Sequence, residues 1–245
     1  MLSKGAEPDR VGLVDLLHEG IAAGKPWSLL PGRSWLRPAH RVDTEASGVL
    51  LLAKNKAALT ALEAFFGSAT PARFYAVIVQ GRPTEDRLEL TSPIGPHPTK
   101  PGQFRIDPDH GKRSSTVVCV RERFSAWTLL ECEALTDRPH QIRVHLRKTA
   151  LPVCGDGNYG GRPLLLSRLK NNYRLKGEAE ERPLLGTPAL HLERVVVPHP
   201  VSGELLTITA PLPKDLVVAL KYLRRYAGGG AAPSHVDNAL DAESE

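Results

Sequence analysis

The sequence predicts an α+β fold with a mainly antiparallel sheet. Segments rich in β-branched and aromatic residues recur along the chain, and only a few stretches carry apolar residues at helical spacing. Parallel winding would place a helix between successive strands, whereas the segments at 189–197 and 204–209 are joined by the short turn-forming sequence PHPVSG. Strands connected this closely favour antiparallel pairing with flanking helices.

Helices are predicted at 8–19, 56–66, 139–148 and 215–226. Asn55 precedes the second helix as an N-cap and Gly67 follows its apolar positions as a C-terminal glycine. Pro139 stands in the first turn of the third helix, where a missing N–H costs nothing. Ile142, Val144 and Leu146 of that helix are expected to face the core.

Strands are predicted at 48–53, 73–80, 117–120, 127–134, 189–197 and 204–209. The first is the continuous apolar run GVLLLA, which is typical of a buried strand. The segments at 117–120 and 127–134 are close enough to form a hairpin. These elements fall within residues 37–226, which we expect to form the main body of the protein.

Two terminal regions flank that body. Residues 1–36 are expected to add a helix and a Pro- and Gly-rich loop to it. Residues 227–245 begin with a glycine run, contain few large apolar side chains and carry four acids without Lys or Arg, so we expect a disordered acidic tail. We expect the protein to act as a monomer.

Composition limits the class of protein. No apolar stretch approaches the roughly 18–20 residues needed to cross a bilayer, and the first residues lack the apolar core of a secretory signal, so a soluble cytoplasmic protein is expected. Cys119, Cys132 and Cys154 are too widely spaced for a zinc ribbon and are expected to be reduced and mostly buried.

The charge distribution favours a polyanionic partner. The net charge is +5, and without the acidic tail it becomes +9, from 32 basic against 23 acidic residues. Many basic proteins bind no nucleic acid, so charge alone leaves this open. The chain contains no GxxxxGK[ST], GxGxxG, GxSxG or HExxH pattern, and therefore no support for a nucleotide cofactor or a metal.

Two segments combine ionisable residues with tightly packed apolar sequence. The first, AHRVDTEASGVLLLAK at 39–54, sets Arg41 and Asp43 directly before the predicted buried strand. The second, TDRPHQIRVHL at 136–146, is followed by PVCGDGNYG at 152–160.

These segments closely resemble the RluA-like family of RNA pseudouridine synthases. That family carries its catalytic aspartate in an HRLDxxTSGLLLLAK block, present here as HRVDTEASGVLLLAK. Its KxYxAxVxG block corresponds to RFYAVIVQG at 73–81, and its TGRxHQIRVHL and PxxGDxxYG blocks correspond to the second segment. The blocks occur in family order across residues 37–213, so the resemblance implies the pseudouridine synthase catalytic fold over residues 37–226.

The resemblance implies roles for particular residues. Asp43 would be the catalytic carboxylate, Tyr75 the active-site tyrosine and Arg143 the basic partner of Asp43. Residues expected to contact RNA are Arg41, His40, Arg138, His140 and Gln141. From the residues themselves, weaker alternatives stay open: Asp43 and Arg143 could form a structural ion pair, Tyr75 could belong to the core, and Arg41 could be an ordinary phosphate contact.

The function implied is isomerisation of uridines in structured ribosomal or transfer RNA. This reaction exchanges an N–C for a C–C bond without redox change, so neither cofactor nor metal is expected. A base must leave its stack before it reacts, and Lys and Arg contacts to phosphates would offset that cost. The alternatives are a catalytically silent RNA-binding relative of the same fold and an unrelated basic α+β protein.

The chain departs from the family pattern at three places. No strand with a KPxG-like block precedes HRVD at the usual distance, so the first strand of the family sheet is expected to be absent. Asp137 replaces a glycine, which would be unfavourable at a positive φ and adds a negative charge beside the site. Glu45 and Ala46 replace the usual Asp and Thr.

Overall fold

The structure, a computed structural model, describes residues 12–29, 35–67, 72–173 and 180–228. Its helices are α1 (Leu13–Ala22), α2 (Lys56–Gly67), α3 (Gln141–Lys148), α4 (Leu166–Leu169) and α5 (Lys214–Tyr226), with 3-10 turns η1 (Pro26–Leu29) and η2 (Gly157–Tyr159). Its strands are β1 (Arg37–Pro38), β2 (Ser47–Gly48), β3 (Leu52–Ala53), β4 (Ala72–Gln80), β5 (Arg87–Thr91), β6 (Ile94–Pro96), β7 (Phe104–Ile106), β8 (Ser115–Arg123), β9 (Trp127–Ala134), β10 (Leu190–Pro198) and β11 (Leu205–Thr209).

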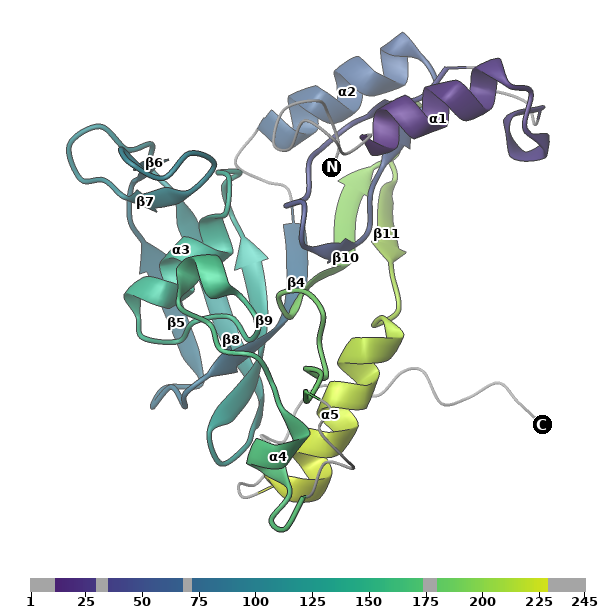
Figure 1. Ribbon diagram of the computed structural model, residues 1–245. Coiled ribbons are helices and arrows are strands. Elements are labelled where there is room, and N and C mark those ends of the chain that lie inside the picture. Colours follow the sequence, from purple (N-terminus) through teal and green to yellow (C-terminus); the bar gives the residue numbers. More distant parts are fainter. Residues whose placement is uncertain (1–11, 30–34, 68–71, 174–179, 229–245) are drawn as a thin grey trace.

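One mixed sheet forms the centre of the molecule (Figure 1). Its strand order is β11-β10-β4-β9-β8-β5 with every neighbouring pair antiparallel, and the short β2 adds to β10 in parallel. Two small hairpins, β1–β3 and β6–β7, lie outside it. The predicted α+β class with a mainly antiparallel sheet is confirmed, and β8 with β9 forms the predicted hairpin.

The described residues form three apolar core clusters, the smallest of which consists of Ile94, Val144 and Tyr159. The other two contain most of the buried side chains. In the larger one, side chains of β4, β8 and β9 pack against α3 and α5, and Val77 and Val79 of β4 are fully buried. In the smaller one, Leu62 and Phe66 of α2 pack on β10. Tyr75 contacts both clusters from β4, so it lies where the two halves of the core meet.

Several local predictions are confirmed. The Asn55 side chain caps α2 by accepting a hydrogen bond of 2.8 Å from the Ala58 N–H. Ile142, Val144 and Leu146 of α3 are all buried. The start of α3 was placed two residues too early, because His140 takes a left-handed conformation with φ 53° and only the residues after it are helical.

The continuous strand predicted at 48–53 is wrong. Only Ser47–Gly48 and Leu52–Ala53 are strand, and they pair with different partners, β10 and β1. Gly48 has φ 121°, which turns the chain away from β10 after a short parallel contact. Periodicity could not reveal this, because Val49 between the two pieces is still buried.

The ends of the chain are only partly covered by the structure. The described residues before β1 form α1 and η1 and no strand, α1 ends at Ala22 rather than at residue 19, and the predicted start of α1 lies outside the described residues. The predicted tail lies outside them too, apart from residues 227 and 228. The three cysteines are unpaired, with Cys132 and Cys154 buried. Within the described ranges, no helix is long and apolar enough to cross a membrane.

Candidate active site

Asp43 lies in the connection between β1 and β2, and this connection is fastened to the sheet at Ser47. The Ser47 hydroxyl bonds His191 Nδ1 on β10 at 2.8 Å, and His191 Nε2 donates to the Ala210 carbonyl at 3.1 Å. At the next position, a Cβ on Gly48 would come within 2.2 Å of the Leu192 carbonyl oxygen. A glycine is therefore required for the Asp43 segment to approach β10 this closely.

Strand β4 supplies Arg73 and Tyr75. Because successive side chains alternate across a strand, these two residues share the face that carries Val77 and Val79 into the core. Arg73 is 2% exposed and Tyr75 is half-buried. Burial raises the pKa of Tyr75, so its hydroxyl stays protonated at physiological pH.

Gln141 shapes the loop that joins β9 to α3. Its Oε1 accepts hydrogen bonds from the Thr136 hydroxyl (2.7 Å) and the Arg138 N–H (3.2 Å). Its Nε2 donates to the Ser115 carbonyl (2.9 Å) and the Thr116 hydroxyl (3.0 Å). The amide thus uses its two donors and its acceptor oxygen inside the protein, which gives Gln141 a structural task in this loop.

Arg143 extends from the first turn of α3 and is 1% exposed. It binds Asp156 through Nε–Oδ2 and Nη2–Oδ1 contacts of 2.7 and 2.9 Å. Its Nη1 lies 3.0 Å from Glu45 Oε2 and 3.6 Å from Asp43 Oδ2. Burial alone would lower the pKa of Arg143, but the Asp156 hydrogen bonds and the other carboxylates raise it above its ordinary value.

His140 closes the site from the N-terminus of α3. Its backbone N–H points at Asp43 Oδ1 over 3.4 Å, and its Nδ1 lies 2.7 Å from the Tyr159 hydroxyl. That hydroxyl accepts from the Phe104 N–H, so its own proton is directed to His140 Nδ1. Burial lowers the pKa of His140 more than Asp43 raises it, which agrees with a neutral ring accepting this bond.

These groups surround a cavity of about 170 Å³. Six of the eight predicted site residues line it: Arg41, Asp43, Tyr75, Arg138, His140 and Gln141. Arg143 reaches the same place through its contact with Asp43. Residues that are distant in the sequence therefore converge on one cavity wall, with a carboxylate, a buried guanidinium and a neutral phenol close together.

His40 is the predicted site residue that lies outside this cavity. It is buried, its ring packs on Phe66 with centroids 5.0 Å apart, and its Nε2 accepts from the Leu51 N–H at 3.1 Å. Its other ring nitrogen bonds the Arg41 carbonyl at 3.3 Å. Burial lowers the pKa of His40 to about 4, so a neutral His40 tethers the segment before Asp43 to the segment before β3.

Asp137 is accommodated without backbone strain, since its φ is not positive. Its carboxylate lies between two arginines, 3.1 Å from Arg73 Nη1 and 3.6 Å from Arg41 Nε. The Arg138 guanidinium does not pair with the Asp137 carboxylate; it donates to the backbone carbonyls of Arg113 (3.1 Å) and Asp137 (3.3 Å). The charge introduced at this position is therefore paired with guanidinium groups of the cavity.

The sequence predictions omitted Asp156, Glu45, Tyr159 and Arg73 as site residues. Asp156 and Tyr159 belong to the PVCGDGNYG block, so the resemblance offered a signal for them. The two-residue spacing of Arg73 and Tyr75 offered another, because it places both on one face of β4. Nothing in the sequence indicated that Glu45 would compete with Asp43 for Arg143.

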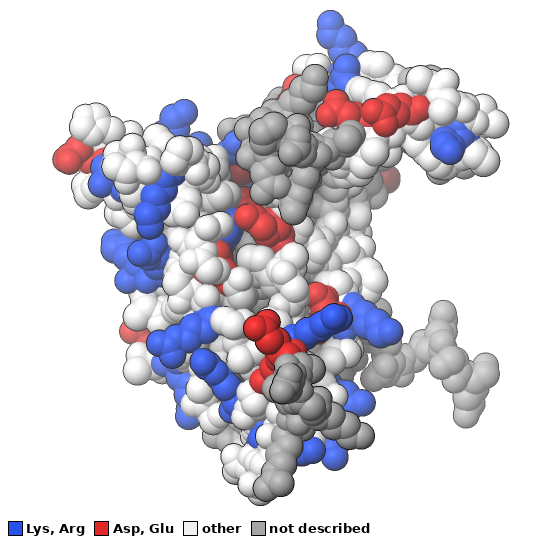
Figure 2. All heavy atoms as spheres, in the orientation of Figure 1, with Lys and Arg blue, Asp and Glu red and all other residues white. Residues whose placement is uncertain are grey.

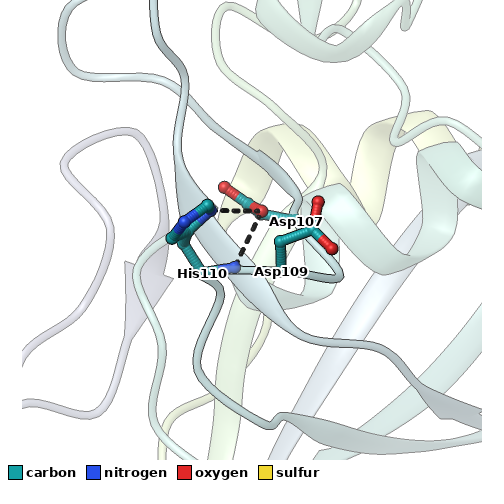
Figure 3. A group of neighbouring side chains, drawn as sticks. All are labelled: Asp107, Asp109 and His110. Carbon is teal, nitrogen blue, oxygen red and sulfur yellow. Dashed lines mark hydrogen bonds and ion pairs between the residues drawn. The ribbon is translucent and has the colours of Figure 1, made fainter.

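Within the described residues, one group of side chains has the spacing of a metal site, Asp107, Asp109 and His110 (Figure 3). Asp107 accepts from the His110 N–H at 3.1 Å and faces Arg105 at 3.4 Å, which lowers its pKa together with the other contacts. Asp109 and His110 are exposed. This arrangement is that of a capped turn after β7.

Comparison with known proteins places the fold and site in context. The family model for RNA pseudouridylate synthase matches residues 25–148, just over half of the 245 residues. An uncharacterised RNA pseudouridine synthase of Bacillus subtilis is 33% identical over 192 residues, which is 78% of this chain and 57% of the relative. The ribosomal large subunit pseudouridine synthase D of Haemophilus ducreyi is 35% identical over 76% of this chain and 55% of its own length.

Solved structures of pseudouridylate synthase domains have a similar fold. The human RNA pseudouridylate synthase domain containing 1 matches with a TM-score of 0.59 at 25% identity, covering 76% of this chain and 73% of that one. A second human protein, RNA pseudouridylate synthase domain containing 4, matches with a TM-score of 0.63 at 21% identity and supports the fold. This chain spans little more than half the length of the bacterial relatives that it matches. The family match, the shared fold and the block order together show that this chain belongs to the RNA pseudouridylate synthase family.

Proposed function

We propose that this protein converts uridine to pseudouridine in structured RNA, with Asp43 as the catalytic carboxylate. The observation that carries this proposal is the meeting of Asp43 with Arg143, 3.6 Å apart although distant in the sequence, beside the cavity that Tyr75 lines. Family membership supports the same reaction class.

The reaction needs few groups from the protein. The bond between uracil N1 and ribose C1′ breaks, the base turns, and a new bond joins C5 to C1′. One proton leaves C5 and one is gained at N1, so atoms and charge balance without an oxidant or a nucleotide. An ionised carboxylate close to the ribose and the base supports this exchange, and a pocket that excludes water strengthens its electrostatic effect.

Arg143 would place a positive charge beside the Asp43 carboxylate in that pocket. A carboxylate transferred into a cavity loses hydration, and a nearby guanidinium compensates for this loss. Arg143 is itself held by Asp156, so it presents Nη1 to Asp43 from a fixed position. Tyr75, protonated because burial raises its pKa, would pack against the base and hold a proton or a water near C5 through its neutral hydroxyl.

RNA would reach the cavity through its basic rim. Arg41, with about half of its side chain exposed, is the cavity arginine most available to a phosphate. Lys and Arg also gather beside β5 and around α4 and α5, while Asp and Glu lie near the centre of this face and over α1 (Figure 2). One relative is named as acting on the ribosomal large subunit, so ribosomal RNA is the first substrate to test and transfer RNA the second.

The N-terminal helix would belong to the same functional unit. Leu13 of α1 lines a second cavity together with Asp43, Thr44 and Gly48. This shared cavity supports our proposal that residues 1–36 complete the catalytic body formed by residues 37–226.

Replacement of Asp43 tests the activity. In a strain lacking the native gene, wild-type protein should restore pseudouridine at particular uridines of ribosomal or transfer RNA, and the Asp43→Asn variant should not. Asp109→Asn removes an exposed carboxylate outside the cavity and serves as the matched control. Identical pseudouridine maps for wild type and Asp43→Asn would refute the proposal.

A catalytically silent RNA-binding protein is the second candidate. It is favoured by one observation, that Nη1 of Arg143 lies closer to Glu45 than to Asp43. Such a protein would bind RNA with strong salt dependence and would leave the pseudouridine map unchanged when its gene is deleted.

A further inference from the structure

We propose that Arg41 and Arg73 form a seat for a phosphate anion at the mouth of the cavity, and that Asp137 occupies this seat until RNA displaces it. The inference rests on the proposed function only in taking the phosphate from RNA. It concerns binding, and so it can be tested without turnover.

The first observation is that the buried Arg73 guanidinium has unused hydrogen-bond donors. Its side chain is 2% exposed, yet Nη1 alone has a charged partner, Asp137 Oδ2 at 3.1 Å. Nε and Nη2 are buried without a hydrogen-bond partner in the described part of the chain. A buried guanidinium with two unused donors is unfavourable unless an anion can bind it, and phosphate offers several acceptor oxygens where a carboxylate offers two.

The second observation is that the exposed Arg41 shares the same carboxylate partner. It approaches the same carboxylate from the other side, at 3.6 Å, and its side chain is 54% exposed. The buried Arg73 and the exposed Arg41 thus converge on one point in the wall of the candidate active site, and both line the cavity. Two guanidinium groups around one anion form the arrangement that proteins use to recognise phosphate.

Asp137 is able to leave this point. It lines the active-site cavity and also an adjoining cavity of about 450 Å³, which Glu63, Phe66 and Gly67 of α2 border. Gln141 holds the loop on both sides of Asp137, through the Thr136 side-chain hydroxyl and the Arg138 backbone N–H. A side-chain rotation into the adjoining cavity would therefore clear the seat without moving the loop.

Asp137 and an RNA phosphate would therefore compete for Arg41 and Arg73. While Asp137 neutralises the two arginines, the seat is closed to phosphate, and the apparent affinity falls by the fraction of time that it is closed. If the carboxylate occupies the seat about nine-tenths of the time, its removal should tighten binding about tenfold.

The test compares Asp137→Asn with Glu63→Gln. Glu63 is exposed, borders the adjoining cavity and forms none of the ion pairs found among the described residues, so its variant removes the same charge nearby without opening the seat. Both variants and wild type are purified in phosphate buffer, and affinity for a ribosomal RNA fragment is measured over a range of salt concentrations.

Asp137→Asn should bind this RNA about tenfold more tightly than wild type, with a salt slope steeper by about 0.7–0.9 for the added phosphate contact. Adding Arg41→Gln should abolish the gain. An equal gain from Glu63→Gln, or a gain that survives Arg41→Gln, would mean that only overall charge matters and would overturn the proposal.

Inorganic phosphate distinguishes a free anion from the RNA backbone. After transfer into a phosphate-free buffer, Asp137→Asn should lose thermal stability, and added phosphate should restore it more than it stabilises wild type. Restoration would show that the seat accepts a free anion; tighter RNA binding without restoration would limit it to the phosphodiester of RNA. An Asp137→Asn protein that is unfolded even in phosphate would show a structural ion pair and would contradict the proposal.

Discussion

Arg143 binds Asp156 through two hydrogen bonds of 2.7 and 2.9 Å and reaches Asp43 with the same guanidinium at 3.6 Å. The shorter contacts belong to a carboxylate that is 1% exposed, and the longer one to a carboxylate that faces the cavity. Asp156 therefore fixes Arg143, while Asp43 is left free to engage a nucleotide.

Asp156→Asn should strongly destabilise the protein. The change leaves the buried Arg143 without its main counterion, and breaking a buried pair typically costs about 3–5 kcal/mol. Urea denaturation measures this, and the folded fraction should also lose activity because Arg143 is no longer fixed. Glu45→Gln is the matched control, since Glu45 is 35% exposed and Arg143 would keep both hydrogen bonds to Asp156, so this change should destabilise the protein much less. Equal destabilisation by both changes would argue against the assigned role of Asp156.

Tyr75→Phe should lower kcat about 100-fold, the lower range for a positioned proton-transfer group, with little change in KM. Burial raises the pKa of Tyr75, so the hydroxyl acts in its neutral form. Wild type and variant should consequently show parallel pH–rate profiles between pH 8 and 10. An alkaline rise present in wild type and absent from Tyr75→Phe would indicate a reactive phenolate instead.

The protein should lose stability as the pH falls from about 6.5 toward 4, in part through His40. The pKa of His40 is about 4 in the folded protein, against 6.5 for an ordinary histidine in the unfolded chain. Between pH 6.5 and 4 the unfolded state therefore binds a proton that the folded state does not, and this proton stabilises the unfolded state relative to the folded one. The contribution is of order 3 kcal/mol. His40→Gln should show a correspondingly smaller loss between pH 7 and 4 in denaturant titrations. An unchanged loss would mean that His40 is not the titrating group.

Gly48→Ala should destabilise the protein by more than about 2 kcal/mol, because the new Cβ would meet the Leu192 carbonyl and φ is positive at this position. The Asp43 segment would then separate from β10, so activity should fall in the folded fraction. Gly186→Ala is the control, since its Cβ would meet nothing within 4 Å and its φ is not positive. Thermal denaturation of the two variants side by side measures the difference.

Much of the fold could be predicted because local pattern determines it. The strand around 73–80 is rich in β-branched and aromatic residues, and Asn55 caps α2 through a contact three residues away. Predictions failed where a distant contact overrides the pattern. The run at 48–53 is apolar throughout, yet Gly48 diverts it, and His140 delays α3 with a conformation unusual for its residue type.

The sequence predicts which chemical groups form the candidate site, but it does not predict which residues those groups contact. The motifs along the chain predict that a carboxylate, a tyrosine and an arginine occur in the order typical of this family. Three further relationships are visible only in the folded protein: Asp156 holds Arg143, the buried His40 ring bonds the Leu51 N–H, and Asp137 lies between two arginines. The physical reason is that burial and ion pairing depend on which distant segments the sheet brings together, and residue spacing along the chain does not encode those distances.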